Sequence, residues 1–208
     1  MTKTPKDNRD SRELLLEAAK SVFARLGFDG ATVKELADTA GVNVSLVSYY
    51  FGGKEGLYRA CLEQFGRERL TAAERLLKAP SDAADFELRL RLFFQEFIEC
   101  HIQEPEIATI MHRECASDMA GIRDLFKEVF FKFFERFANF VGDAQKAGLV
   151  RADAETKISS AILFGGLVQM LRMDWASTEV HGTCMKDPAF RDKVVHNAVR
   201  TFVHGILA

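Results

Sequence analysis

Three glycine-containing breaks divide the first 58 residues into short segments, and this division limits what the chain can fold into. The breaks lie at Gly27, Gly41 and Gly52–Gly53. Between them apolar residues recur every three or four positions, which is the periodicity of an amphipathic helix. Glycine ends helices readily because it adopts the left-handed conformation without strain. The spacing predicts helices over 10–26 and 33–40, a third helix that Asn43 caps and that runs to Tyr50 or Phe51, and a fourth over 54–77.

Polar residues at the expected cap positions support these boundaries. Asp10 and Glu13 have the spacing of a capping box, and Thr32 and Asn43 stand where the second and third helices would need an N-cap. Two short helices joined by a glycine-containing turn, after a first helix, are the pattern of a helix-turn-helix unit. The sequence therefore predicts such a unit over residues 1–57.

Beyond Pro80 the predicted helices become longer. Apolar periodicity indicates helices over 82–101, 105–117, 122–147, 154–176 and 187–207, with Pro105 and Pro188 at first helical positions. The chain has only four prolines and few alternating patterns, so an all-α fold is expected. Residues 58–208 are predicted to form a larger helical domain for effector binding and dimerisation.

Composition leaves the partners of the chain open. The 208 residues carry a formal net charge of -2, which does not exclude DNA, because only the contacting face must be basic. The four cysteines form no CxxC pair, no apolar run opens the chain, and the apolar stretch 161–168 is far short of the ~18 residues of a membrane span. These features favour a cytoplasmic protein, associated with the nucleoid if it binds DNA.

The first quarter of the chain resembles a known family. The segment AAKSVFARLGFDGATVKELADTAGVNVSLVSYYFGGKEGLY resembles the N-terminal domain of TetR/AcrR-type transcriptional regulators. The anchors of the resemblance are Ala19, Phe23, Gly27–Phe28, Thr32–Val33, Leu36–Ala37, Ala40–Gly41–Val42, Tyr49, Phe51, Lys54 and Leu57. The helical remainder has the length expected for this family and resembles a CerR-like subgroup.

The resemblance implies a homodimeric, all-helical, ligand-responsive DNA-binding protein. No cofactor is predicted. Such a protein is usually a repressor that binds a palindromic double-stranded operator and is released by a small effector. One position departs from the family pattern, because Ser48 stands where a tyrosine is common. Serine lacks the ring and phenol of tyrosine, so the departure concerns one aromatic phosphate contact and not the fold.

A helical wheel divides the third helix into an inner and an outer side. Val47 and Phe51 lie one turn apart and are expected to face the other helices. Side chains near the N-terminus of a recognition helix reach base edges, and hydroxyls beside them bind phosphates. The candidates for base edges are Val44, Ser45, Leu46 and Ser48, and those for phosphates are Thr32, Lys34, Tyr49, Tyr50 and Lys54.

Each phosphate candidate has a structural alternative. Tyr49 and Tyr50 could pack their rings with only the hydroxyls in water, and Thr32 could act only as a cap. Lys34 and Lys54 could be ordinary surface charges. The basic residues Lys3, Lys6, Arg9 and Arg12 could enter a neighbouring groove or belong to a flexible tail.

Phenylalanines follow one face of the predicted helix 122–147. Phe126, Phe130, Phe133, Phe137 and Phe140 are three or four residues apart, as in a core stripe or the lining of an apolar pocket. An apolar or amphipathic effector is expected, and the candidate pocket residues are Met111, His112, Cys115, Met119, Phe130, Phe133, Phe137 and Trp175. His112 and Cys115 share a face, but without four convergent ligands no metal site is predicted.

The last two predicted helices have the character of a dimer interface. The helix 154–176 is apolar on most faces and contains Gly165–Gly166, so another helix can approach it closely. Two such helices from each copy would form a four-helix interface with two-fold symmetry. The candidate interface residues are Ile162, Gly165, Gly166, Gln169, Val195, Val199, Phe202 and Ile206.

Two other classes of function remain open at this point. A helical enzyme is disfavoured because the sequence has no nucleophile elbow, phosphate-binding glycine loop or metal motif, and we predict that the chain is not an enzyme. A protein-interaction module without sequence-specific DNA binding would use the tyrosine face of the third helix for a protein partner.

Overall fold

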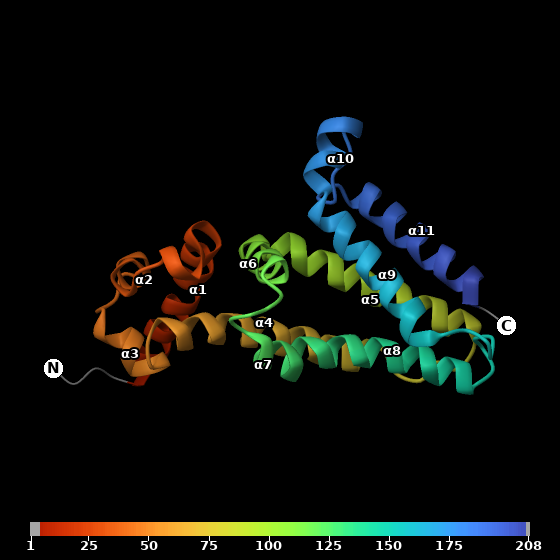
Figure 1. The fold of residues 1–208 in the computed structure, drawn as a ribbon, viewed down its shortest axis with the longest axis horizontal. Helices are drawn as coiled ribbons and strands as arrows, with labels where there is room; N and C mark the ends of the chain where they lie inside the picture. The colour runs from red at the N-terminus through yellow and green to blue at the C-terminus, as the bar shows by residue number, and fades with distance from the viewer. Residues whose placement is uncertain (1–4, 207–208) are drawn as a thin grey trace. The chain divides into compact units, whose positions relative to one another are not determined.

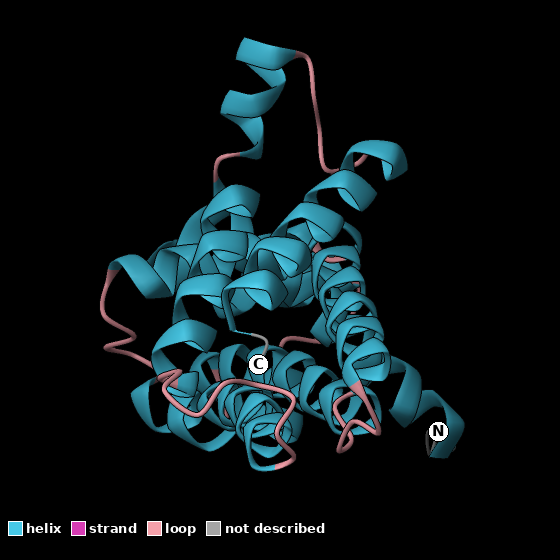
Figure 2. Cartoon of the chain, turned by 90° about the vertical axis from the view of Figure 1, so that its right-hand side faces the viewer, coloured by secondary structure: helices cyan, strands magenta, loops and turns pink. Residues whose placement is uncertain are grey.

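The computed structural model of the chain describes residues 5–206, with side chains from residue 11 onward, and its regular secondary structure there is helical (Figures 1 and 2). The predicted all-α fold is confirmed. The helices are α1 (Pro5–Gly30), α2 (Val33–Ala40), α3 (Ser45–Phe51), α4 (Lys54–Leu76), α5 (Ala83–Gln103), α6 (Pro105–Ala116), α7 (Arg123–Leu125), the π-helical η1 (Phe126–Phe130), α8 (Phe131–Lys146), α9 (Thr156–Arg172), α10 (Asp174–His181) and α11 (Pro188–Ile206).

Packing divides the chain into two compact units. Unit 1 comprises the chain up to Arg67 together with Glu104–Glu128, and unit 2 comprises Glu68–Gln103 and the chain from Val129 onward. Helices α6 and α7 therefore pack with the N-terminal helices, although they follow them by more than thirty residues in sequence. The functional division after residue 57 stays a prediction.

In unit 1, α1 contacts α2, α3 and α6. The largest residues at its centre, Phe23 and Leu36, have no exposed surface, and Val47 of α3 is equally buried. Burying an apolar side chain of this size stabilises a fold by about 1.5–3 kcal/mol. Val47 therefore anchors α3 to the unit, as its position on the helical wheel predicted.

The start of α1 differs from the predicted one. The helix begins at Pro5, so Asp10 lies inside it and is not an N-cap. Proline suits a first helical position because its fixed φ matches the helix and its missing N–H would have no partner there. The break at Gly27 is confirmed, because this residue has φ +75° within α1. Lys3 and the side chains of Lys6 and Arg9 lie outside the described residues, and Arg12 is part of α1.

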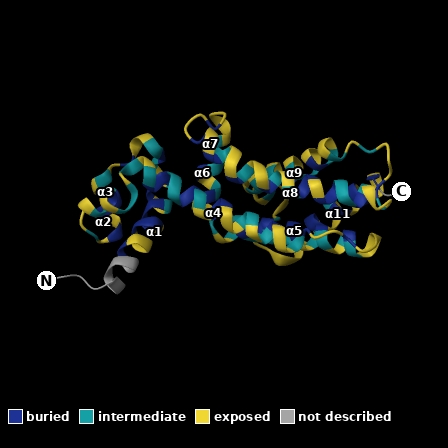
Figure 3. Cartoon of the chain, turned by 90° about the horizontal axis from the view of Figure 1, so that it is seen from below, coloured by how far each residue is buried: buried dark blue, intermediate teal, exposed yellow. Residues whose placement is uncertain are grey.

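Unit 2 is built on phenylalanines from α5 and α8. Phe93 and Phe137 stack with their ring centroids 5.3 Å apart, and Phe86 and Phe140 stack at 5.2 Å. The inner sides of α9 and α11 complete this core, and buried positions gather on the inward faces of these helices (Figure 3). The aromatic stripe predicted over 122–147 is thus largely core at Phe133, Phe137 and Phe140.

Two helices predicted as continuous are interrupted. The segment 122–147 forms α7, the π-helical η1 and α8, and the segment 154–176 ends at Arg172 before α10 begins at Asp174. Met173, between α9 and α10, has φ -97° and ψ 10°, outside the helical range. Periodicity does not detect such breaks, because the apolar pattern continues across them. Among the described residues, every helix is too short or too polar to cross a membrane.

Candidate nucleic-acid interface

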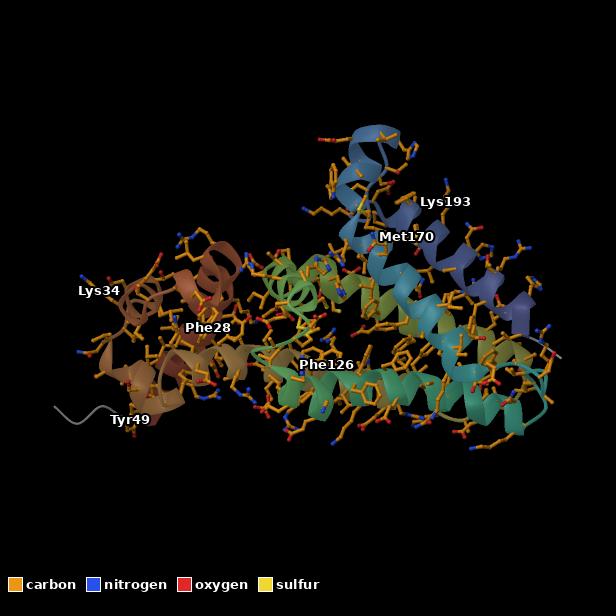
Figure 4. All side chains as sticks on the ribbon, viewed as in Figure 1. Phe28, Lys34, Tyr49, Phe126, Met170 and Lys193 are labelled. Atoms are coloured by element: carbon orange, nitrogen blue, oxygen red, sulfur yellow. The ribbon has the colours of Figure 1, made fainter. Side chains whose placement is uncertain are left out.

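Helix α3 presents one side to solvent while Val47 holds the other side in unit 1. Ser45, Ser48 and Tyr49 are exposed, and the Tyr49 side chain is 70% exposed. Val44, immediately before the helix, is also exposed, whereas Leu46 is half-buried. Figure 4 shows Tyr49 projecting from α3 and Lys34 projecting from α2. The residues predicted to meet DNA are therefore accessible from solvent, apart from the half-buried Leu46, Tyr50 and Lys54.

Capping residues fix the ends of α2 and the end of α3. Thr32 accepts a hydrogen bond from the Glu35 N–H at 3.1 Å, which confirms its predicted capping role. Gly41 ends α2 with φ +66°, and Gly52 ends α3 with φ +73°. These left-handed caps would be strained in most other residues. They fix the directions in which the chain enters and leaves α3.

Asn43 acts on α3 from one residue further away than predicted. The helix begins at Ser45, and Asn43 Oδ1 accepts hydrogen bonds from the Ser45 N–H at 2.9 Å and from the Ser45 hydroxyl at 2.7 Å. With its proton directed to Asn43, the Ser45 oxygen offers lone pairs to solvent. Ser45 is thus oriented as a hydrogen-bond acceptor.

The two adjacent tyrosines differ in their surroundings. Their rings meet edge to face with centroids 4.9 Å apart, and the Tyr50 ring also lies 6.2 Å from Phe51. Tyr50 is half-buried in this cluster, so it partly fits the packing alternative. The exposure of Tyr49 excludes that alternative for its own ring. Arg12 extends the cluster, because its guanidinium carbon lies 5.2 Å from the centroid of the half-buried Phe51 ring.

Lys54 does not point freely into solvent. Its ammonium nitrogen donates to the carbonyl oxygens of Phe28, at 2.8 Å, and Ala31, at 3.1 Å, and lies 4.4 Å from the centroid of the Phe28 ring. An ammonium has three donors, and two are used here. The interpretation of Lys54 as primarily a phosphate contact is therefore corrected: it ties the start of α4 to the segment between α1 and α2.

Gly56 is a positioning residue that the sequence analysis missed. A Cβ atom at this position would lie 1.8 Å from the Phe51 carbonyl oxygen, far closer than atoms can approach. Only glycine lets the last residue of α3 approach the first turn of α4 so closely. The sequence contained a signal for this role. A glycine inside a predicted helix lowers helix stability by about 1 kcal/mol relative to alanine, so its presence indicates a close contact that a side chain would block.

Helix α6 is tied to the helices of unit 1 by hydrogen bonds that the sequence analysis also missed. Arg113 donates to the carbonyl oxygens of Phe23, at 2.9 Å, and Ala24, at 3.0 Å, next to the break in α1. The Tyr58 hydroxyl donates to Glu114 Oε1 at 2.5 Å. No sequence motif marks these partners, because they are more than fifty residues apart.

The Tyr58 contact predicts a change in stability at alkaline pH. Burial raises the pKa of Tyr58 above its ordinary value, and the hydrogen bond to Glu114 raises it further. A raised pKa contributes stability that is fully present below about pH 10 and is lost as pH rises, because the unfolded chain releases its proton first. Burial also raises the pKa of Cys61 to about 12, which acts in the same direction. We expect Tyr58→Phe to weaken the loss of stability between pH 9 and 11, measured by urea denaturation.

That substitution separates the two groups, since Cys61 titrates in both proteins. It should also lower stability at pH 7 by about 1–3 kcal/mol, because Glu114 loses its buried partner. An unchanged alkaline slope would show that Tyr58 does not carry the effect.

The predicted pocket residues are not brought together within one unit. Met111, His112, Cys115 and Met119 belong to unit 1, and Phe130, Phe133, Phe137 and Trp175 belong to unit 2. Phe137 has no exposed surface, and the space beside Phe133 has a volume of about 10 Å³, room for about one water molecule. Trp175 is 62% exposed on α10, so its assignment to a pocket is wrong. Periodicity placed it inside a continuous helix that in fact ends at Arg172.

The predicted dimer residues divide between the two helices. Ile162, Gly165, Gly166 and Gln169 of α9 are exposed. Val195 and Val199 of α11 are buried in the core of their own unit, so they do not form a free stripe, whereas Phe202 and Ile206 are also largely buried but line the groove beside α9. A periodic apolar stripe shows that a face is buried, not which neighbour covers it. Among the described residues there is no cluster of three or more side chains that could hold a metal ion.

Comparison with known proteins agrees with this geometry. The model of the family described as "Bacterial regulatory proteins, tetR family" matches residues 15–61, which contain α2, α3 and most of α1. The transcriptional repressor NicS of Pseudomonas putida is 33% identical over 104 residues, which are 50% of this chain and 48% of NicS. The transcriptional regulator RutR of Escherichia coli K12 is 25% identical over 94% of this chain and 90% of RutR.

A solved structure supports the fold over nearly the whole chain. The transcriptional regulator FadR of Bacillus subtilis, in complex with stearoyl-CoA, superimposes with a TM-score of 0.76 and 15% identity, covering 93% of this chain and 98% of FadR. The chain spans about half the length of NicS, so activities and partners are not transferred from it. The CerR-like subgroup is not confirmed by these relatives. The helix-turn-helix geometry and the match at residues 15–61 together show that the chain carries the N-terminal domain of the tetR family of bacterial regulatory proteins, and the fold of the rest of the chain is similar to that of FadR.

Proposed function

We propose that this protein is a homodimeric transcriptional repressor that binds a palindromic operator and is released by a small apolar or amphipathic effector. One observation carries the proposal: Val47 fixes α3 to unit 1 while the opposite side of the helix is exposed between two left-handed caps. A major groove admits one such helix, and an anchored helix can present its side chains at fixed positions.

The base contacts are assigned to the start of α3. Ser45, held as an acceptor by Asn43, suits the amino group of cytosine or adenine in the major groove. Ser48 offers a second hydroxyl, and Val44 is placed to meet a thymine methyl group, with Leu46 as a partly covered neighbour. These side chains are short, so sequence discrimination depends on close approach of the helix to the bases.

The phosphate contacts are assigned to Thr32, Lys34, Tyr49 and Tyr50. Lys34 supplies the positive charge, and the hydroxyl of Tyr49 lies on the most exposed ring of α3. Thr32 caps α2, whose N-terminal N–H groups favour an anion. Lys54 is assigned to positioning. These contacts set the register of α3 without reading sequence.

Footprinting on the DNA beside the protein's own gene tests this function. We expect protection of a palindrome whose half-sites are separated by about one helical turn or a multiple of it. Ser45→Ala is expected to weaken operator binding by about 1–3 kcal/mol and to relax selectivity at one base pair, with little change on unrelated DNA. Equal binding to all sequences would contradict the assignment of α3 to base reading.

A structurally similar regulator supports the proposed chemistry of the effector. FadR of Bacillus subtilis was solved with stearoyl-CoA, which is amphipathic. An effector of this class would act by binding more tightly to a conformation that fits the operator poorly. Native mass spectrometry of the purified protein would identify a retained ligand. We place the protein in the cytoplasm, in contact with the nucleoid, on the basis of this function.

A protein-interaction module would use the same exposed face of α3. Tyr49→Ala distinguishes the two, since loss of operator binding with an unchanged dimer favours the repressor. An enzyme is not favoured, because the relatives are transcriptional regulators.

A further inference from the structure

The outer side of α9 is apolar and uncovered. Ile158 and Ile162 lie on it, Ile162 is 71% exposed, and the exposed Met173 follows the last residue of the helix. A spacing of four residues returns to the same side of a helix, so the two isoleucines begin one stripe that continues towards Met173. An exposed apolar stripe of this length on one helix indicates a surface that is covered by a partner.

Two glycines interrupt this stripe at its midpoint. Cβ atoms built on Gly165 and Gly166 would meet nothing within 4 Å, apart from the helix's own backbone, and the same holds for Gly205 on α11. Glycine inside a helix costs about 1 kcal/mol relative to alanine. No packing among the described residues requires these glycines, so the close approach that they permit must involve another molecule.

A groove runs between α9 and α11 beside the glycines. Its volume is about 780 Å³, its floor includes Leu167 and Phe202, and Gly166 and Gly205 lie along it. Met170 and Lys193 mark its other end, on facing helices (Figure 4). The groove is large enough for several side chains, and its apolar lining suits an apolar occupant.

Helix α10 carries an apolar side chain that its own unit leaves uncovered. None of its eight residues, all of them described, is buried, and Trp175 is 62% exposed. Figure 1 shows α10 continuing past the end of α9, where the two helices are separated by Met173. Burying a tryptophan contributes strongly to interfaces, so an exposed one at the end of an apolar stripe is a candidate anchor.

The stripe fits a second copy of itself when two α9 helices run antiparallel. With Gly165–Gly166 on the two-fold axis, Ile158 meets the partner's Met173 and Ile162 meets the partner's Gln169. Charge favours the same direction, because Glu155 near the start of α9 then approaches the partner's Arg172 near its end. Neither residue forms an ion pair within the described part of the chain. A parallel arrangement would bring like charges together.

This arrangement also gives α10 a place. The start of α9 and the end of α11 lie together within one copy, since the Arg151 N–H donates to the Ile206 carbonyl at 2.9 Å. The antiparallel partner therefore brings its Trp175 to this end of the groove, beside Ser159 and Gly205. We propose that α10 is a dimerisation arm whose Trp175 inserts into the α9–α11 groove of a second copy. This inference rests on the proposed homodimer and adds its register and its anchor.

The tryptophan itself supplies the first test. The chain contains one tryptophan, so its emission reports only position 175. In the dimer the emission should be blue-shifted and protected from acrylamide, and in the monomeric variant Gly166→Arg it should be red-shifted and fully quenched. Trp175→Ala should weaken dimerisation by about 30-fold, measured by sedimentation equilibrium, as for an interface hot spot of ~2 kcal/mol.

Leu88→Ala is the matched control, because Leu88 is an exposed apolar residue on α5 that does not line the groove. It should leave dimerisation unchanged. A dimer whose Trp175 remains fully quenched would overturn the arm while leaving the homodimer intact. A monomer that protects the operator would instead overturn the proposed homodimer.

Disulfide trapping tests the register. In a protein whose exposed Cys115 and half-buried Cys184 are replaced by serine, Ile158→Cys mixed with Met173→Cys should form a cross-linked dimer on oxidation. Each variant alone should not, whereas Gly165→Cys should cross-link to itself. Efficient self-linking of Ile158→Cys would overturn the antiparallel register.

Discussion

Replacing Gly56 with alanine is expected to lower the free energy of unfolding by about 3 kcal/mol and to abolish operator binding. The added methyl group would stand 1.8 Å from the Phe51 carbonyl oxygen, and backbone atoms cannot move aside as a flexible side chain can. Overpacking of this kind costs about 1–3 kcal/mol when the structure shifts to relieve it. The shift would move the end of α3 away from α4, and with it the orientation of Tyr49 and Ser48.

Gly142→Ala is the matched control for that substitution. Gly142 lies in α8, and a Cβ there would be 4.0 Å from its nearest neighbour outside the helix backbone, the Thr156 hydroxyl oxygen. Alanine should therefore raise stability by about 0.5–1 kcal/mol through its better helix propensity. Urea denaturation of both variants measures the difference. Equal midpoints would show that α3 and α4 do not need the close approach at Gly56.

Replacing Lys54 with methionine should separate positioning from phosphate binding. Methionine keeps an unbranched stem of similar length but loses the bonds to the Phe28 and Ala31 carbonyl oxygens. Hydrogen bonds to charged groups contribute about 1.5–3 kcal/mol each, so stability should fall by about 3 kcal/mol. Operator affinity should fall because the segment before α2 is released, while the dependence of affinity on salt should stay nearly unchanged.

Lys34→Gln should show the opposite pattern. Lys34 is exposed, so its replacement should leave unfolding unchanged within about 0.5 kcal/mol. The slope of the logarithm of affinity against the logarithm of salt concentration should fall by about 1, as expected for one lost phosphate contact. If Lys54→Met instead lowers the slope by the same amount without a loss of stability, then Lys54 contacts phosphate and its carbonyl bonds are secondary.

The candidate interface was predictable where local chemistry determines it. Thr32 as a cap and Gly41 and Gly52 as helix ends follow from the conformations that these residues prefer. Val47 as the anchor of α3 follows from helical period alone. The Tyr49 face could be placed on the outside for the same reason.

Other assignments depend on neighbours that are distant in sequence, and these went wrong. Lys54 was expected to reach outward, but its ammonium donates to the carbonyl oxygens of Phe28 and Ala31. Trp175 was expected inside a pocket, but the break at Met173 directs it to solvent. Composition and period give no information on either point.

By itself, the sequence determined the all-α class, the helix-turn-helix unit and the exposed side of α3, because caps, glycine conformation and helical period act over a few residues. Only the tertiary structure decided that α11 buries its apolar stripe in its own core while α9 keeps one side free, and that Gly56 must be glycine. The physical reason is the same in each case. The periodicity of apolar residues along a helix shows that one face needs a neighbour. Only the packed chain shows whether that neighbour lies within the same chain or must come from another molecule.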